Sequence, residues 1–384
     1  MIPIAKPLLG EEEAKAASEA ILSGWVTQGP RVKQFEDEFS AYVGSKHACA
    51  VSNCTTALHL ALHALGVKAG DEVITVSHSF IATANVIRYC GAVPVFVDID
   101  DKTFNMDPAL IKAAITPKTK VILCVHQIGM PCDMPAIIKI AKAHGLKVVE
   151  DAACCAGSEI NIDGTWEKIG RAHGDAACFS FHPRKVITTG DGGMVTTNDP
   201  DLDAQFKLLR QHGMSVPDTV RHKSNEVIFE GYPILGFNYR LTDIQAAIGI
   251  EQLKRLDDLV AERRKLAALY TELLADLPVV SPHQPDWACS NWQSYQILCP
   301  EIPQKPLMQA LQDKGIATRR GIMNAHREDA YSDEGTCQLP ENGLPVSEMV
   351  QDTGVILPLF PGMTEEQVRL VVVELTQALK AFEG

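Results

Sequence analysis

The chain has 384 residues, of which 46% are hydrophobic and 22% are charged, and 35 Lys and Arg against 48 Asp and Glu give a formal net charge of −13. This composition is typical of a globular protein of two or three domains, and it excludes collagen-like, low-complexity and disordered chains. The acidic excess also argues against a nucleic-acid-binding protein, although a few backbone amides can still bind a phosphate locally.

Between residues 45 and 200, short β-branched runs alternate with segments of helical periodicity. Strands are predicted over residues 48–51, 72–76, 93–97, 121–125 and 147–150. The helices predicted between them cover residues 55–65, 81–89, 108–114 and 134–144. This alternation favours an α/β fold with a mainly parallel sheet covered on both faces. Ligands of such sheets bind at the carboxyl ends of the strands, so residues that follow a strand are the leading site candidates.

The C-terminal part of the chain follows a different pattern. A long helical periodicity runs over residues 243–274 and is followed by several prolines. Shorter elements are predicted after it, at residues 292–299, 306–314, 354–357 and 364–382. We therefore expect a large α/β domain over residues 1–255 and a smaller C-terminal α+β domain over residues 256–384.

The eleven cysteines indicate reduced thiols rather than disulfides. Their number is odd, no C-x-x-C pair occurs, and Cys154 and Cys155 are adjacent. The N-terminal segment has no apolar signal-like run, and no stretch approaches 18 apolar residues. These features predict a cytoplasmic protein that does not associate with a membrane.

Asp151 stands at the end of the predicted strand L-K-V-V-E-D. A carboxylate at the end of a buried strand is costly unless a positive group meets it. One interpretation is a cap for the following turn. The other is an anion that keeps a heteroaromatic nitrogen protonated, as the chemistry of pyridoxal 5′-phosphate (PLP) requires.

Lys185 lies in the segment F-S-F-H-P-R-K-V-I-T-T-G-D-G-G. A single lysine on a loop is usually a solvated charge. This lysine instead follows a strand and Ser180 and precedes a glycine-rich stretch where the backbone can approach a ligand closely. Lysine forms a Schiff base with the PLP aldehyde, and a site that lowers its pKa supplies the free amine.

A third candidate segment is S-N-C-T-T-A-L at residues 52–58, where a strand passes into a helix. The unpaired amides of the first helical turn and the two threonine hydroxyls can form a cradle for an anion. Ordinary N-capping by Ser52 or Asn53 is the alternative, although it does not explain the paired threonines.

Together these segments resemble the DegT/DnrJ/EryC1/StrS family of PLP-dependent sugar aminotransferases, which have the PLP-dependent transferase fold type I. The resemblance extends through nearly the whole chain. It is carried by residues 23–30 (S-G-W-V-T-Q-G-P), 52–62, 79–85, 126–134 (H-Q-I-G-M-P-C-D-M), 150–153, 180–185, 236–240 (G-F-N-Y-R) and 357–363.

The resemblance implies a role for each matching residue. Lys185 would be the Schiff-base lysine and the base that moves the proton, and Asp151 would pair with the pyridine nitrogen. Phe80 stands where the family stacks an aromatic ring on the cofactor, although by itself it could equally be a core residue.

The same resemblance implies which residues would hold the phosphate. Ser180, Thr55 and the backbone amide of Thr56 would bind it, together with Asn238 from a neighbouring subunit. The minimum assembly would then be a homodimer with shared active sites.

The chain departs from the family pattern at two positions. Cys54 replaces the usual glycine beside the phosphate. Cys154 stands where the family has Gln or His near the ring hydroxyl, so its contribution to cofactor binding is either reassigned or lost. An inert thiol is the simpler interpretation of Cys154.

Contacts with the substrates are assigned by charge and position. Cationic and polar side chains suit an anionic amino donor or a nucleotide diphosphate, and the alternative for each basic residue is plain surface charge. The candidates are Trp25, Thr27, His182, Arg240, Arg319, Arg320 and His326.

The expected activity is transfer of an amino group from glutamate or glutamine to a keto sugar, a nucleotide-linked keto-deoxy sugar, in amino-sugar and cell-surface polysaccharide biosynthesis. Two alternatives share the fold. Some relatives dehydrate sugars and carry His in place of the Schiff-base lysine, which Lys185 argues against. A non-enzymatic regulator would not need the set of Asp151, Ser180 and Lys185.

Overall fold

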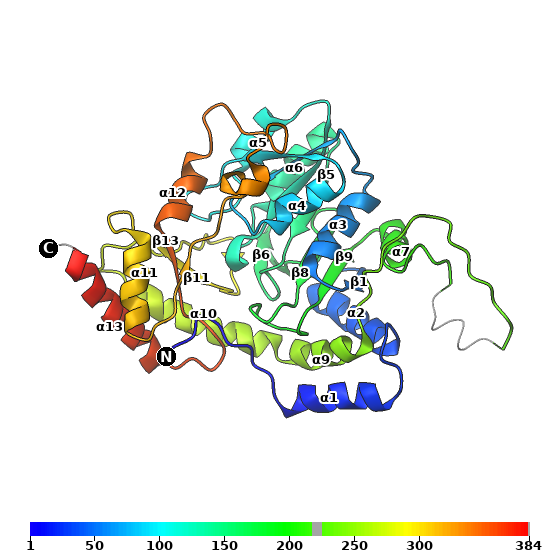
Figure 1. The fold of residues 1–384 in the computed structure, drawn as a ribbon, viewed down its shortest axis with the longest axis horizontal. Helices are drawn as coiled ribbons and strands as arrows, with labels where there is room; N and C mark the ends of the chain where they lie inside the picture. The colour runs from blue at the N-terminus through cyan, green and yellow to red at the C-terminus, as the bar shows by residue number, and fades with distance from the viewer. Residues whose placement is uncertain (217–224, 383–384) are drawn as a thin grey trace.

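A seven-stranded sheet forms the centre of the computed structural model, which describes residues 1–216 and 225–382 (Figure 1). The strand order is β1-β9-β8-β5-β4-β2-β3. Only β9 is antiparallel to its two neighbours in this sheet, so the predicted mainly parallel sheet is confirmed. The strands are β1 (His47–Val51), β2 (Glu72–Val76), β3 (Val93–Val97), β4 (Thr119–Val125), β5 (Lys147–Asp151), β8 (Ala176–Ser180) and β9 (Gly193–Thr197).

Helices cover both faces of this sheet. Strand residues alternate between two apolar clusters, so that Ile122 packs on one side and Val121 on the other. One cluster contains α3 (Cys54–Ala64), α4 (Ala82–Tyr89) and α7 (Pro200–Leu209). The opposite cluster contains α2 (Pro30–Val43), α5 (Pro108–Ala114), α6 (Met134–His144) and α9 (Asp243–Lys254), and α1 (Glu11–Leu22) packs outside α9.

Local capping explains why several of these helices begin where they do. Asp107, Asp133 and Asp199 each accept a hydrogen bond from a first-turn amide, and a proline follows within the first two helical positions. Aspartate caps satisfy unpaired amides, and proline fits the first turn because its missing N–H has no partner there. The chain therefore turns sharply after a strand and returns along the sheet.

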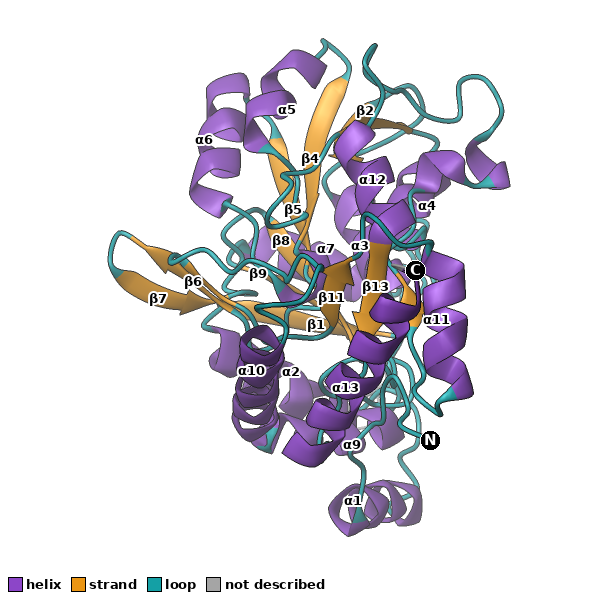
Figure 2. Cartoon of the chain, turned by 90° about the vertical axis from the view of Figure 1, so that its left-hand side faces the viewer, coloured by secondary structure: helices purple, strands orange, loops and turns teal. Residues whose placement is uncertain are grey.

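The C-terminal part has its own sheet and its own apolar cluster (Figure 2). Its strands pair in the order β11-β13-β12, all antiparallel. A further small sheet, β10-β6-β7, projects beside the large sheet. The elements are β6 (Glu159–Ile162), β7 (Thr165–Lys168), β10 (Ala288–Cys289), β11 (Tyr295–Leu298), β12 (Arg319–Arg320), β13 (Gly354–Leu357), α11 (Gln304–Asp313), α12 (Pro345–Thr353) and α13 (Glu365–Phe382).

The long helix predicted over residues 243–274 is two helices in the structure. Arg255 has φ −104° and ψ 0° and separates α9 from α10 (Leu256–Leu273). Leu256 at the start of α10 packs in the large cluster, whereas Tyr270 near its end packs in the C-terminal cluster. The predicted domain boundary at residue 256 stays a prediction, because α10 contributes to both clusters.

Two expectations about cysteines and membranes can be compared with the structure. All eleven cysteines are free thiols, as the spacing predicts. Among the helices of the described residues, none is both long enough and apolar enough to cross a membrane.

Candidate functional site

The carboxyl ends of four parallel strands meet at one edge of the large sheet. Asp151 of β5 pairs in register with Val125 of β4 and with Cys178 of β8. Ser180, two residues further along β8, pairs with Gly193, which in turn pairs with Val51 at the end of β1. The candidate segments around Asp151, Ser180 and the start of α3 are therefore neighbours at this edge, as parallel-sheet geometry requires.

Asp151 is buried at this edge, with 5% of its surface exposed. Its Oδ2 accepts a hydrogen bond of 2.8 Å from the Thr83 hydroxyl, and its Oδ1 accepts one of 3.1 Å from the Ala153 amide. Burial raises the pKa of Asp151, although these two bonds and the charge of Lys185 oppose the shift. A buried carboxylate that is incompletely compensated favours a cationic or proton-donating partner.

Lys185 points its amine at Cys154, with 3.0 Å between Nζ and Sγ. Burial by itself lowers the pKa of Lys185, but Cys154, Cys54 and Asp151 together outweigh burial, so the pKa is raised. In the protein without a ligand, the neighbouring thiols and a carboxylate thus favour the ammonium form of Lys185.

The start of α3 carries the donors predicted to form an anion cradle, and one of them is already engaged. The Thr56 amide donates to the Asn53 side chain at 2.9 Å, and the Thr56 hydroxyl donates to the Asn53 carbonyl at 2.7 Å. The Thr56 amide can therefore reach a phosphate only by sharing its hydrogen. Thr55 lies in the first turn, where the helix offers its amide no acceptor. The Ser180 hydroxyl accepts a long bond of 3.4 Å from the His182 amide.

Phe80 and Asn238 are exposed in the single chain. Phe80 has 60% of its surface exposed and lies between β2 and α4, beside the segment that supplies Thr83 to Asp151. Asn238 forms a backbone bridge with Gln211, and its side chain is exposed. Both are accessible to a ligand or to a second subunit.

Several predicted substrate residues lie near the site, and one additional residue joins them. Burial lowers the pKa of Arg319, and the charges of Arg184 and Arg320 lower it further. Cys154 acts in the opposite direction. Arg319 and Arg184 are therefore both close enough to the Cys154 region for their charges to matter there. His182 accepts a hydrogen bond of 3.2 Å from the Arg184 amide, and burial lowers its pKa. Sequence reasoning missed Arg184, although its position directly before Lys185 was a usable signal.

Trp25, Thr27 and Arg240 are each bonded to other parts of the chain. The Trp25 indole donates to the Gln28 carbonyl at 3.0 Å, and the Thr27 carbonyl accepts from the Asp243 amide at 3.0 Å. Arg240 forms a backbone bridge with Val51 at the end of β1.

His326, predicted as a substrate contact, is bonded on both sides within the chain. Its Nδ1 is 2.7 Å from the Ser77 hydroxyl and its Nε2 is 3.1 Å from Glu348 Oε1, and only 8% of its side chain is exposed. Because both ring nitrogens are engaged, His326 links the end of β2 to α12 and has no nitrogen left for a substrate.

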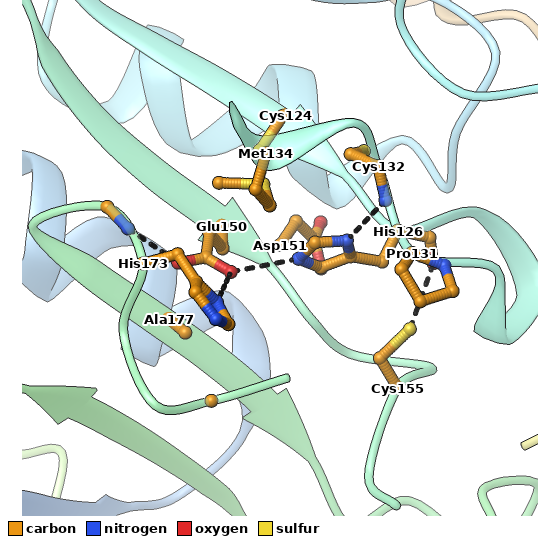
Figure 3. Close-up of polar contacts among 12 residues, drawn as sticks. Cys124, His126, Pro131, Cys132, Met134, Glu150, Asp151, Cys155, His173 and Ala177 are labelled. Carbon is orange, nitrogen blue, oxygen red and sulfur yellow. Dashed lines mark hydrogen bonds and ion pairs between the residues drawn. The ribbon is translucent and has the colours of Figure 1, made fainter. Parts of the chain in front are cut away.

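A buried ionic cluster lies beneath the site, on the Glu150 side of β5 (Figure 3). His126 Nε2 is 3.1 Å from Glu150 Oε2, and the Gly174 amide donates to Glu150 Oε1 at 2.8 Å. His173 lies between Glu150, at 3.9 Å, and Glu167, at 3.0 Å. The sequence analysis did not single out this cluster, because its members are separated along the chain and meet only across strands.

The residues at the strand ends fit the groups of PLP. Asp151 offers a buried carboxylate that lacks a full complement of partners, which suits a protonated ring nitrogen. Lys185 offers an amine to an aldehyde, and Thr55 with Ser180 offers donors to a phosphate. The residues therefore offer partners for the ring nitrogen, the aldehyde and the phosphate of the cofactor.

Comparisons with known proteins show the family of the chain. The model of the DegT/DnrJ/EryC1/StrS aminotransferase family matches residues 7–376. GDP-perosamine synthase of Caulobacter vibrioides is 40% identical over 384 residues, covering 98% of this chain and 98% of that protein. The spore coat polysaccharide biosynthesis protein SpsC of Bacillus subtilis is 37% identical over 388 residues, covering 100% and 98%. The structure of Spr1654 from Streptococcus pneumoniae in its PLP form has a TM-score of 0.90 and 27% identity, with 99% of both chains covered.

Proposed function

The chain belongs to the DegT/DnrJ/EryC1/StrS aminotransferase family and is a PLP-dependent sugar aminotransferase, and we propose that it moves an amino group from glutamate to a nucleotide-linked keto-deoxy sugar. The observation that carries the proposal is that a buried, incompletely paired carboxylate, Asp151, and the buried amine of Lys185 lie at the same edge of the sheet, where they influence each other's charge. The product would enter amino-sugar and cell-surface polysaccharide biosynthesis. The reduced thiols of the chain suit a cytoplasmic location of the enzyme.

PLP supplies an aldehyde for amines and a ring that withdraws electrons from the bonds being broken. With PLP bound, Asp151 would keep a proton on the ring nitrogen, because a positive neighbour stabilises its buried carboxylate. Lys185 would offer its amine at Nζ to the aldehyde and would act as the base that moves the proton. Thr55 and Ser180 would hold the phosphate, and Phe80 would contact the ring. In this assignment Cys154 contacts the lysine rather than replacing it.

A group of positively charged side chains near Cys154 supports the substrate assignment. Arg319, Arg320 and Arg184 lie close together, although the chain as a whole has a net charge of −13. A local cationic cluster suits the carboxylates of glutamate and the diphosphate of a nucleotide sugar. The name of the Caulobacter relative, GDP-perosamine synthase, also describes a nucleotide-linked amino sugar.

The loaded protein tests these assignments. Borohydride reduction followed by peptide mapping should place the cofactor label on Lys185, and Lys185→Ala should bind PLP without a covalent label. Glutamate and glutamine are then offered separately, followed by a panel of nucleotide-linked 4-keto and 3-keto sugars. A label on another lysine overturns the site assignment, and turnover with free keto acids alone overturns the sugar assignment.

We further propose that the active unit is a homodimer in which Asn238 serves the partner's phosphate site. The segment before Asn238 exposes large apolar side chains and extends away from the sheet beyond α7 (Figure 1). These are Val227 at 86%, Phe229 at 89% and Leu235 at 87% exposed. Such a patch favours burial against a second copy of the chain.

Mixed subunits test this sharing. Lys185→Ala and Asn238→Asp proteins, each inactive alone, are unfolded together and refolded. With shared sites, random pairing places one intact site in about half of the dimers. If Asn238 acts within its own chain, every site keeps one defect and no activity returns.

A further inference from the structure

The segment Ser290–Gln293 passes beneath the candidate site on its way into β11. Asn291 within it is fully buried. Its Nδ2 donates to the carbonyls of Cys154 and Ala156, both at 2.8 Å, and its own amide donates to the Ser158 hydroxyl at 3.0 Å. Asn291 therefore fixes the backbone of the loop that follows Asp151.

Gln293 makes the corresponding bond to the loop that carries Lys185. Its Nε2 donates to the Arg184 carbonyl at 2.7 Å, which is the carbonyl directly before Lys185. The two amides are also joined, because the Gln293 backbone N–H donates to Asn291 Oδ1 at 2.9 Å. One short segment thus holds the backbones of both partners in the contact between Lys185 and Cys154.

The segment is itself held rigidly. Trp292 has φ +49°, a left-handed conformation that persists only where the surroundings enforce it. Arg263 is fully buried and donates to the carbonyls of Trp292 at 3.2 Å, Gln293 at 3.3 Å and Leu359 at 3.1 Å. A Cβ at Gly129 would lie 2.1 Å from Asn291 Oδ1, so the side chain of Asn291 has no room to shift in that direction.

We propose that Asn291 and Gln293 are positioning residues that set the place of Lys185 relative to Asp151 and Cys154 through the two loop backbones. The lysine side chain is long, so a small shift of its backbone moves the amine. The Lys185 amide donates to the His182 carbonyl at 2.8 Å and the Arg184 amide to His182 Nδ1 at 3.2 Å, both within the same turn. The Gln293 bond ties that turn to a distant part of the chain. Displacement of a reacting group by about 1 Å can cost roughly a hundredfold in rate. The inference rests on the role of Lys185 proposed above.

The test compares two glutamines that both donate to backbone carbonyls. Gln293→Met removes the donor to Arg184 with little change in volume. The matched control is Gln304→Met, because Gln304 Nε2 binds the carbonyls of Gln351 at 2.8 Å and Gly354 at 2.6 Å, both in the C-terminal part. Both variants are prepared as full chains with PLP, and borohydride mapping first establishes that Lys185 carries the label.

Three readouts are taken for each protein: the pH midpoint of the visible cofactor absorbance, kcat with KM, and Tm. Gln293→Met should move the midpoint by roughly half a pH unit or more. It should lower kcat by about tenfold or more with little change in KM. Gln304→Met should lower Tm and leave the midpoint and kcat as in the wild type. An unmoved midpoint and kcat in Gln293→Met, with Lys185 labelled, overturns the proposal.

A second variant covers the case in which Gln293→Met does not fold. Asn291→Asp keeps the acceptor for the Gln293 amide, removes the donors to the Cys154 loop and places a carboxylate oxygen against the two carbonyls there. In the protein without PLP, the rate at which iodoacetamide alkylates Cys154, followed by mass spectrometry, should rise severalfold. An unchanged rate contradicts the positioning role. A label found elsewhere than Lys185 contradicts the proposed function instead, so the two failures are distinguishable.

Discussion

Two adjacent carboxylates at the end of β5 have opposite surroundings. Glu150 and Asp151 point to opposite faces of the sheet, as successive residues of a strand must. Glu150 meets His126, His173 and the Gly174 amide, and these partners hold its pKa below the usual range against the effect of burial. Asp151 meets one hydroxyl and one amide, and burial raises its pKa.

The difference separates an anion that is paired inside the protein from one that we propose to be functional. Glu150 already has its counter-charge inside the protein, because His173 lies between two carboxylates and its pKa is raised against the effect of burial. Asp151 lacks an equivalent cation fixed beside it and faces the site edge. An anion that is left incompletely paired in the folded chain is suited to bind a positive group that arrives with a ligand.

The largest expected effect follows from removing the charge of Asp151. Asp151→Asn is nearly isosteric and keeps an oxygen for Thr83, so the fold should persist. Loss of the partner for the ring nitrogen should lower kcat by about 10²- to 10⁴-fold, the range for a lost protonation role. Steady-state kinetics at saturating PLP measure this. Turnover close to the wild-type rate would mean that Asp151 is only a cap for its turn.

Glu150→Gln should show the reverse pattern. Removing one charge of a buried pair leaves the other uncompensated, and the expected loss is about 3 kcal/mol of unfolding free energy. The fall in kcat should be much smaller than that of Asp151→Asn. Denaturant titration of both variants side by side provides the measurement. Equal stability of Glu150→Gln and wild type would remove the distinction between the two carboxylates.

The pH dependence of stability sharpens the comparison further. Because the pKa of His173 is raised in the folded protein, its contribution to folding stability is complete below its unfolded pKa of 6.5. That contribution is lost as pH rises through the pKa of His173 in the folded protein. The lowered pKa of Glu150 means that its contribution is present above 4.5 and is lost on acidification. Wild-type stability should therefore fall on both sides of this range.

In His173→Gln the alkaline part of this loss should disappear, so the Tm difference from wild type narrows as pH rises. The exposed His144 supplies a matched control, and His144→Gln should keep the wild-type profile. Parallel profiles for wild type and His173→Gln would show that His173 is neutral in the folded protein.

The smallest effect is expected at Cys154. Cys154→Gln should be tolerated or should change substrate preference, and Cys154→Ser should alter kcat by less than about tenfold, below the usual loss of an acid–base group. Cys154→Ala should also lower the pKa of Lys185, because the thiol contributes to its raised value. Steady-state kinetics measure the change in kcat, and the pH dependence of PLP loading measures the change in the pKa of Lys185. If Ser and Ala variants were both inactive with PLP bound, the thiol would perform essential chemistry.

Much of the fold was predictable because its signals are local. The alternating strands and helices of residues 45–200, and the strand-end positions of Asp151 and Ser180, follow from periodicity and turn residues that a reader can see along the chain. The break at Arg255 was missed, because the apolar repeat continues across it while the direction of packing changes.

The sequence by itself determined the parallel sheet and the residues that follow its strands, since each depends on neighbours in the chain. Only the tertiary structure decided which charges are compensated. Glu150 and Asp151 are adjacent in sequence, yet one meets two histidines and the other a hydroxyl. The bonds from Asn291 and Gln293 to the site loops likewise span more than 100 residues. Burial and long-range partners set these energies, and neither is encoded in a local pattern.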